Sequence, residues 1–288
     1  MNQSSGPEKE KSLAALDELF LSVKAYRSSH SYLDLLKFIC RLPKYSPYNC
    51  FLLHMQNPDV SYVATAGQWA KRFGRRIVSG AHPLVILAPM SPVLFVFDVV
   101  DTEGDPLPNG LVTPFATTGK LSETVWNKTI FNLFRDRIRL LLEPMHASRA
   151  GWIMKAQRGD TVTRNGETEP AWYRMQVNSV LDRGAHYATL THELGHLYAG
   201  HLGTPNEEYW PDRSCLGLEE REFEAESICY LICQRAGIAN PSDAYLAGYM
   251  QSGRDIPDIS FDCVLKVAGL IESMGKQTLK SRLNKGKK

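Results

Sequence analysis

The sequence contains 288 residues, enough for one large globular domain or two ordinary ones, and its hydrophobic and charged fractions of 43% and 22% are typical of globular proteins. No run approaches the roughly 18 apolar residues of a membrane span, and the polar start lacks the apolar core of a signal peptide, which argues against a membrane partner and favours the cytoplasm. The formal net charge of +2 indicates no class of partner by itself, and the six scattered cysteines are expected to be free thiols.

The first part of the chain is predicted to be a small α+β domain over residues 11–100, after a disordered start at residues 1–10. Apolar residues at helical spacing predict one or two helices over residues 11–40, with a break near residues 28–31. The next helix covers residues 45–58, a basic helix or turn covers 67–77, and proline-separated β-rich runs at 84–88 and 93–100 predict a hairpin. Residues 101–120 are dense in Gly, Pro and Thr, which predicts a linker or long loop.

Residues 121–275 are predicted to form a second α+β domain, a small sheet with two strong helices. A helix is expected over about 121–143, and a polar loop separates the two predicted strands. The strands are 151–158 and 171–180, and the later helices are 183–201, 218–236, 243–252 and 260–274. The basic tail, residues 276–288, is expected to fray.

The sequence motif that can bind a metal and catalyse a reaction is H-E-x-x-H, formed by His192, Glu193 and His196. Residues four apart share one face of a helix, so both imidazoles can reach one metal ion with bonds of about 2 Å. Glu193 is rotated by about 100° around the helix axis, which places it beside the ion as a general base for a bound water. Two surface histidines would be the bland alternative, but the long amphipathic helix after a predicted strand favours a zinc site, and Gly195 would allow another element to approach closely.

A catalytic zinc site keeps three protein ligands and an open position, and the next helix offers five glutamates. Helical geometry places Glu222 and Glu226 within about 40° of each other, on a stripe of small and apolar residues. Glu222 is the predicted third ligand and Glu226 the acceptor for a ligand imidazole N–H, although the two roles could be exchanged. The solvated outer face is expected to carry the other three, Glu219, Glu220 and Glu224.

Other candidate residues surround this motif. His201 is turned about 140° away from His196 and is predicted to cap the helix rather than bind metal. The strand at residues 173–180 is the predicted edge strand for an extended peptide substrate. An oxyanion donor is expected, and the sequence does not single one out among Tyr198, Tyr245 and Tyr249.

The N-terminal domain is basic and aromatic between Lys37 and Phe97, where seven Lys or Arg accompany one acid. Cations that neutralise phosphates and rings that stack on bases suit single-stranded DNA, whereas a solvated basic face over an aromatic core would have the same composition. The cations are Lys37, Arg41, Lys44, Lys71, Arg72, Arg75 and Arg76, and the interleaved aromatics are Tyr45, Tyr48, Trp69 and Phe73.

The segments THELGHLYAGH and EREFEAESICYLICQRAGI resemble the ImmA/IrrE family of metallopeptidases, in which an H-E-x-x-H helix precedes a glutamate helix of the form E-x-x-A-x. This resemblance implies a zincin-like fold with one Zn²⁺ ion on His192, His196 and Glu222. It also implies that Glu193 is the catalytic base. The family often has Asn where this chain has Glu226, which leaves the choice of Glu222 or Glu226 as third ligand open.

Residues 45–87 separately resemble the N-terminal domain of ArdC-type antirestriction proteins, which pair a single-stranded-DNA-binding domain with a metallopeptidase-like domain. The first hypothesis is therefore a zinc-dependent endopeptidase that cleaves a protein substrate, such as a repressor, and binds nucleic acid through its N-terminal domain. The alternative is a non-catalytic DNA-binding antirestriction-type protein with a structural zinc site. His2Glu sites also accept manganese, so the residues alone do not fix the metal.

Overall fold

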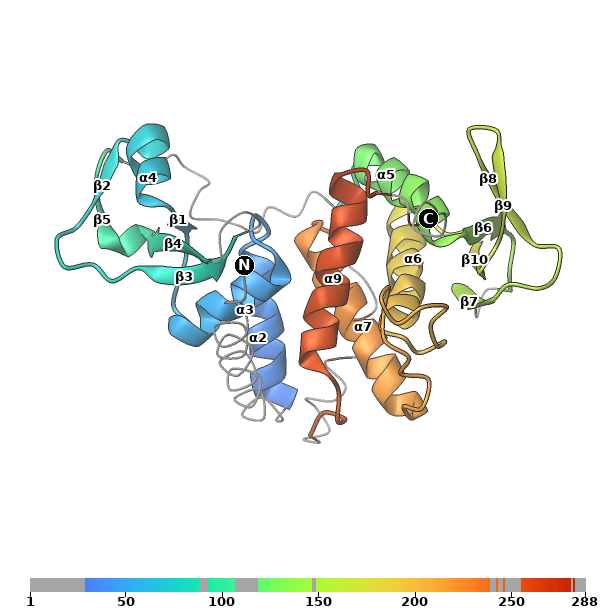
Figure 1. Cartoon of the computed structure of the whole chain (residues 1–288). Helices are drawn as coiled ribbons and strands as arrows, with labels where there is room; N and C mark the ends of the chain where they lie inside the picture. Colours follow the sequence, from blue (N-terminus) through green and yellow to red (C-terminus); the bar gives the residue numbers. More distant parts are fainter. Residues whose placement is uncertain are drawn as a thin grey trace, which may run out of the picture.

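The computed structural model has mixed helices and small sheets, which confirms the predicted α+β class (Figure 1). It describes residues 29–88, 93–106, 119–146, 149–238, 242, 246, 255–280 and 282. A central group of helices lies between two regions that carry the sheets. The helices are α2 (Ser29–Arg41), α3 (Pro47–Gln56), α4 (Ala66–Phe73), α5 (Glu123–Leu133), α6 (Arg183–Tyr198), α7 (Leu218–Arg235) and α9 (Phe261–Lys276). The strands are β1 (Val63–Ala64), β2 (Arg75–Ile77), β3 (Leu84–Leu87), β4 (Val93–Asp98), β5 (Thr102–Gly104), β6 (Ile138–Glu143), β7 (Gly151–Lys155), β8 (Thr161–Arg164), β9 (Glu167–Pro170) and β10 (Tyr173–Asn178).

We call α4 and β1–β5 the N-terminal lobe. Its larger sheet has the order β1–β4–β3 with antiparallel pairs, so the predicted hairpin between residues 84–88 and 93–100 is confirmed. A capping box at Thr65 begins α4, and Gly74 ends it with a φ of 59°, which lets the chain turn directly into β2.

One part of the predicted linker over residues 101–120 is a strand instead. Thr102–Gly104 form β5, which pairs antiparallel with β2, and the Arg75 guanidinium donates to the Thr102 hydroxyl at 2.8 Å. Gly and Pro content predicted a loop here because composition does not reveal a partner strand far away in the sequence. Residues 107–118 of the predicted linker lie outside the described part of the chain.

Helix α3 covers the outer edge of β3. The Asn49 side chain donates to the Leu87 carbonyl at 3.0 Å and accepts from the Leu87 N–H at 2.9 Å. Gln56 makes the same pair of bonds with Val85, both at 2.8 Å. These two amides satisfy backbone groups that an edge strand would otherwise expose, and they attach the N-terminal lobe to the helices.

The second sheet has the order β6–β10–β7, in which β10 is parallel to β6 and antiparallel to β7. The predicted helix over residues 121–143 is wrong in its last part, because α5 ends at Leu133 and β6 begins at Ile138. Arg137 lies between them with a φ of 51°, in the left-handed region that ends helices. Ile138 pairs with Tyr173 of β10, a distant partner that local periodicity could not indicate.

The predicted polar loop at residues 159–169 contains a hairpin. Strands β8 and β9 pair antiparallel, and Asn165 and Gly166 form the turn between them with φ values of 52° and 83°. Asn-Gly is the strongest short signal for a two-residue hairpin, so the sequence contained the information that the loop prediction overlooked.

The central helices share one buried core that includes α2 and α3. The rings of Tyr32 and Phe223 lie 5.5 Å apart, which joins α2 to α7. Arg235 of α7 is buried against Glu272 of α9 and donates to the Ile39 carbonyl at 2.7 Å. Helices from both ends of the sequence are therefore packed as one layer.

The tail prediction is wrong for Leu279 and Arg282, which both contact the rest of the protein. The Leu279 N–H donates to the Asn132 side chain at 2.9 Å, and Arg282 lies 2.8 Å from the buried carboxylate of Asp136. Residues 283–288, the predicted disordered start and most of the predicted helix at 243–252 lie outside the described residues. Among the residues that the structure describes, no helix is long and apolar enough to cross a bilayer.

Candidate metal centre

Two neighbouring helices bring the predicted ligand side chains together. The Asp182 carboxylate caps α6 by accepting from the Ala185 N–H at 2.9 Å, and α6 then carries His192 and His196 one turn apart. Glu222 comes from α7, which packs against α6 at Gly195: a Cβ at this position would lie 3.4 Å from the backbone of α7, so the space leaves little room for a side chain larger than that of alanine. Two helix surfaces that meet at a glycine can face their polar side chains toward a common point.

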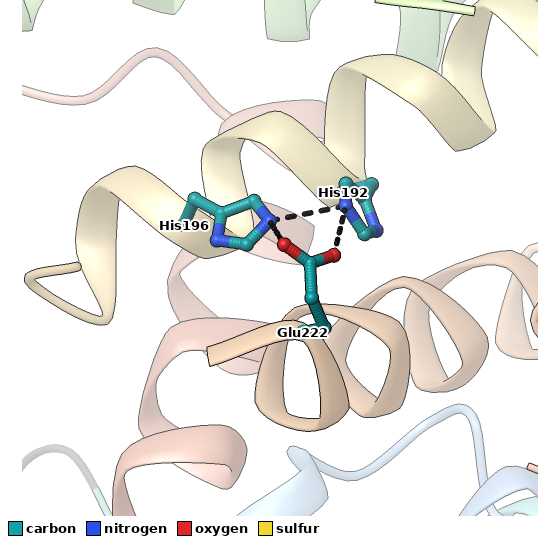
Figure 2. Close-up of side chains that lie close together, drawn as sticks. All are labelled: His192, His196 and Glu222. Atoms are coloured by element: carbon teal, nitrogen blue, oxygen red, sulfur yellow. Dashed lines mark hydrogen bonds and ion pairs between the residues drawn. The ribbon is translucent and has the colours of Figure 1, made fainter. Parts of the chain in front are cut away.

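The three donor groups converge on one point, as Figure 2 shows. The Nε2 atoms of His192 and His196 are 3.1 Å apart, and the two Glu222 oxygens lie 3.6 Å and 3.5 Å from them respectively. Donors around a tetrahedral zinc ion with bonds of about 2.0–2.1 Å are separated by about 3.3 Å. The residues therefore fit one divalent ion.

Glu226 lies on the other side of His192. Its Oε1 is 3.7 Å from His192 Nδ1, the nitrogen that points away from the convergence point, and its second oxygen accepts a hydrogen bond from Ser242. This separates the two glutamates that the sequence left open: Glu222 faces both Nε2 atoms, and Glu226 faces the remaining nitrogen of one ligand.

Glu193 is buried beside the three donors and accepts a hydrogen bond from the Ile153 backbone. Burial raises the pKa of its carboxyl to about 7, His196 opposes this and Glu222 adds to it. A cleft of about 350 Å³ opens over the group, lined by His192, His196, Glu222 and Glu193 together with residues of β7. A carboxyl with such a pKa is suited to proton transfer near neutral pH.

The prediction that Glu224 is solvated is wrong. Glu224 is 0% exposed, and both of its oxygens accept from Arg213, at 2.7 Å and 2.6 Å. Burial alone would raise its pKa, but hydrogen bonds from His201, Arg213 and the Ser260 backbone bring the pKa below its usual value. Helix α7 packs between α6 and α9, so its side opposite Glu222 is also buried. Apolar residues around the whole helix were the signal that could have shown this.

His201 follows the end of α6 and is buried, which the sequence did not predict. Its Nδ1 lies 3.0 Å from Nδ1 of His196, and its Nε2 lies 2.9 Å from the Glu224 carboxylate. Burial lowers the pKa of the imidazole, an effect that the hydrogen bond to Glu224 opposes. His201 does not reach the convergence point itself, but it contacts one of the three residues that do.

The prediction that residues 173–180 form the edge beside the site is wrong, because β10 pairs with strands on both of its sides. The outer strand is β7, whose residues Gly151, Trp152 and Ile153 line the cleft. Local alternation identified a half-buried strand but could not give its position in the sheet.

Of the three candidate oxyanion donors, the structure describes Tyr198 alone, and this side chain does not line the cleft. The Tyr198 hydroxyl is buried and donates to Asp136 at 2.7 Å. Tyr245 and Tyr249 lie outside the described residues.

A second, largely apolar pocket of about 260 Å³ adjoins the site on the far side of His192. Its lining includes Ala150, Leu181, Ala185, Ala188, Thr189, Glu226, Cys229 and Ser242.

The basic and aromatic residues of the N-terminal lobe divide between surface and core. Trp69 is 0% exposed, its indole N–H donates to the Phe97 carbonyl at 3.0 Å, and its ring packs 5.2 Å from that of Phe73. Lys71 and Arg72 on the same helix are exposed. Lys71 and Arg72 thus face solvent, whereas the Trp69 ring belongs to the core.

Comparisons with known proteins return little for this chain. No protein-family model matches it, and no curated protein matches it. One solved structure is similar, the metal-free crystal structure of the antirestriction protein ArdC from plasmid R388, with 17% sequence identity and a TM-score of 0.36. The match covers 90% of this chain and 93% of that chain. A score of this size does not establish a shared fold, so the resemblance to ImmA/IrrE peptidases and the zincin-like assignment stay predictions.

Proposed function

We propose that this protein is a zinc-dependent endopeptidase that uses His192, His196 and Glu222 as ligands and Glu193 as its general base. The observation that supports this most directly is the spacing of the donor atoms, 3.1 Å to 3.6 Å, with a buried carboxyl beside them in an open cleft. A bound zinc ion would supply Lewis-acid polarisation of a carbonyl and lower the pKa of a water.

In this proposal each side chain has a distinct task. Glu193 accepts the proton of the attacking water and delivers it to the nitrogen of the leaving amine. The outer strand β7 pairs with an extended segment of the substrate through its backbone, because its residues Gly151–Ile153 line the cleft. The apolar pocket beyond His192 receives an apolar substrate side chain next to the bond that is cleaved.

A second candidate is a DNA-binding antirestriction-type protein in which the metal is structural. The exposed positions of Lys71 and Arg72 favour it, because both can contact phosphates. Arg76 is less suited to this task, since it already pairs with Glu103 at 2.9 Å. The two candidates differ in the need for a general base.

The test measures metal content by mass spectrometry and cleavage of a mixture of quenched fluorogenic peptides. We expect His196→Ala and Glu222→Ala to lose the metal, whereas Glu193→Gln keeps the metal and cleaves at least about 100-fold more slowly. Glu220→Ala on the same helix is the matched control and should behave as wild type. A Glu193→Gln variant that cleaves as fast as wild type would overturn the peptidase proposal. A Glu193→Gln variant that cleaves no peptide but protects DNA from restriction as well as wild type does would favour the second candidate.

A further inference from the structure

A chain of buried polar groups leads away from the metal centre. It begins at Nδ1 of His196, the ring nitrogen opposite the one that faces Glu222, and continues through both nitrogens of His201 to Glu224. The side chains of His201 and Glu224 are 1% and 0% exposed. Nothing in the proposed chemistry uses these residues, yet burying such groups is costly unless they are fully hydrogen-bonded.

The groups around Glu224 determine which atom donates in each hydrogen bond of this series. Arg213 donates to both oxygens of Glu224, at 2.7 Å and 2.6 Å, and the Ser260 N–H donates to one of them at 2.7 Å. Because these donors surround the carboxylate, Glu224 accepts from His201 Nε2 rather than donating to it. The proton of a neutral His201 is then on Nε2, and its Nδ1 carries a lone pair.

That lone pair faces His196 Nδ1 at 3.0 Å, so His196 must donate from Nδ1. A neutral imidazole with its proton on Nδ1 has its free lone pair on Nε2, the atom that faces Glu222 at 3.5 Å and His192 at 3.1 Å. Only this tautomer can bind a metal through Nε2. Every hydrogen bond in the chain is satisfied in this one arrangement.

The second histidine ligand, His192, has no comparable hydrogen bond to its remaining ring nitrogen in the described part of the protein. His192 Nδ1 lies 3.7 Å from Glu226, beyond hydrogen-bond distance, and the His192 side chain is 20% exposed against 14% for His196. The remaining ring nitrogen of His196 thus has a partner at hydrogen-bond distance, whereas that of His192 is farther from Glu226 than a hydrogen bond allows.

We propose that His201 is a positioning residue that, held by Glu224 and Arg213, fixes the ring orientation and tautomer of His196 for metal binding. This inference rests on the metal binding in the proposed function, but not on peptide hydrolysis. Substitution of a residue that hydrogen-bonds to a metal ligand typically weakens metal affinity 10- to 100-fold.

The experiment measures the zinc dissociation constant of wild type and variants by competition with a chromophoric chelator. We expect His201→Phe, which removes the acceptor, to weaken zinc binding by about 10- to 100-fold. His201→Asn keeps an oxygen close to the position of Nδ1 and should recover most of the affinity. His186→Phe is the matched control and should bind zinc as wild type does, because this histidine of α6 contacts the Asn178 carbonyl and not His196.

A merely structural role is distinguished by the melting temperature of the metal-free proteins. If His201→Phe lowers that temperature but leaves zinc affinity unchanged, the positioning role is wrong. If wild type itself binds no zinc, or if His196→Ala binds as tightly as wild type, the metal site of the proposed function fails instead.

Nitrogen NMR of the zinc-loaded wild-type protein tests the same idea without any variant. We expect the proton of His201 on Nε2 and that of His196 on Nδ1. A His201 ring that carries its proton on Nδ1, or on both nitrogens, would overturn the proposal even if every His201 variant fails to fold.

Discussion

The metal centre and the N-terminal lobe place their charges in opposite ways. Beside the metal centre a charged pair is inside: Glu224 is 0% exposed and is held by Arg213. In the N-terminal lobe the aromatic Trp69 is inside, and the cations Lys71 and Arg72 face solvent. A cluster of charged and aromatic residues in the sequence therefore does not indicate a binding site by itself. It must also be known which of these residues are buried and which are exposed.

The difference also predicts how each region responds to change. Buried ion pairs are costly to break because one charge is left without a partner, whereas exposed pairs contribute little and are screened by salt. Substitutions at the metal centre should therefore act mainly on stability and metal affinity. Substitutions of the surface cations should act mainly on the salt-dependent binding of an anionic partner.

The largest expected effect compares one arginine from each region. Arg213→Met leaves the buried Glu224 without its main partner and should lower the free energy of unfolding by about 3–5 kcal/mol. Arg76→Met removes a pair in which the arginine side chain is 81% exposed, and should cost about 0–1 kcal/mol. Urea denaturation of the metal-free proteins measures both, and equal losses would contradict the contrast between the regions.

Metal binding gives the next largest effect. Zinc at about 100 times its dissociation constant should stabilise wild type by about 2.7 kcal/mol, because it binds only the folded state. Thermal or chemical unfolding with and without a chelator measures this difference. His196→Ala should show none of it, and stabilisation of that variant would mean that zinc acts at another site.

A smaller effect tests the surface of the N-terminal lobe. If this lobe binds single-stranded DNA, changing Lys71 and Arg72 together to Ala should weaken binding of an oligothymidine by about tenfold and reduce the slope of log affinity against log salt by about 1.4. Trp69→Phe keeps the core and should leave DNA affinity unchanged, since the indole is buried. Fluorescence anisotropy at several salt concentrations separates these outcomes, and a selective loss in Trp69→Phe would show that this ring reaches the bases.

The smallest expected effect tests whether a loss of stability in the N-terminal lobe changes metal binding at the metal centre. Thr65→Ala removes the side-chain cap of α4 and should cost about 1 kcal/mol of stability in the N-terminal lobe. Zinc affinity, measured by chelator competition, should not change. A weakened zinc site would show that α4 and the metal centre are coupled through α3.

The sequence indicated those parts of the site that depend on one helix at a time. The spacing of His192 and His196 places both on one face of any helix, and the stripe that holds Glu222 follows from the same geometry. The hairpin of β3 and β4 was predictable for a similar reason, because its strands are adjacent in the sequence. In each case the information lies within a few turns of helix or two neighbouring strands.

Only the tertiary structure decided which side of each element would meet another element. Glu224 is buried because α7 packs between α6 and α9, β6 is a strand because β10 lies beside it, and β10 is internal because β7 covers its other edge. The local sequence determines which residues share a face. Burial of that face depends on partners distant in the chain, whose positions are set by the packing of the whole core.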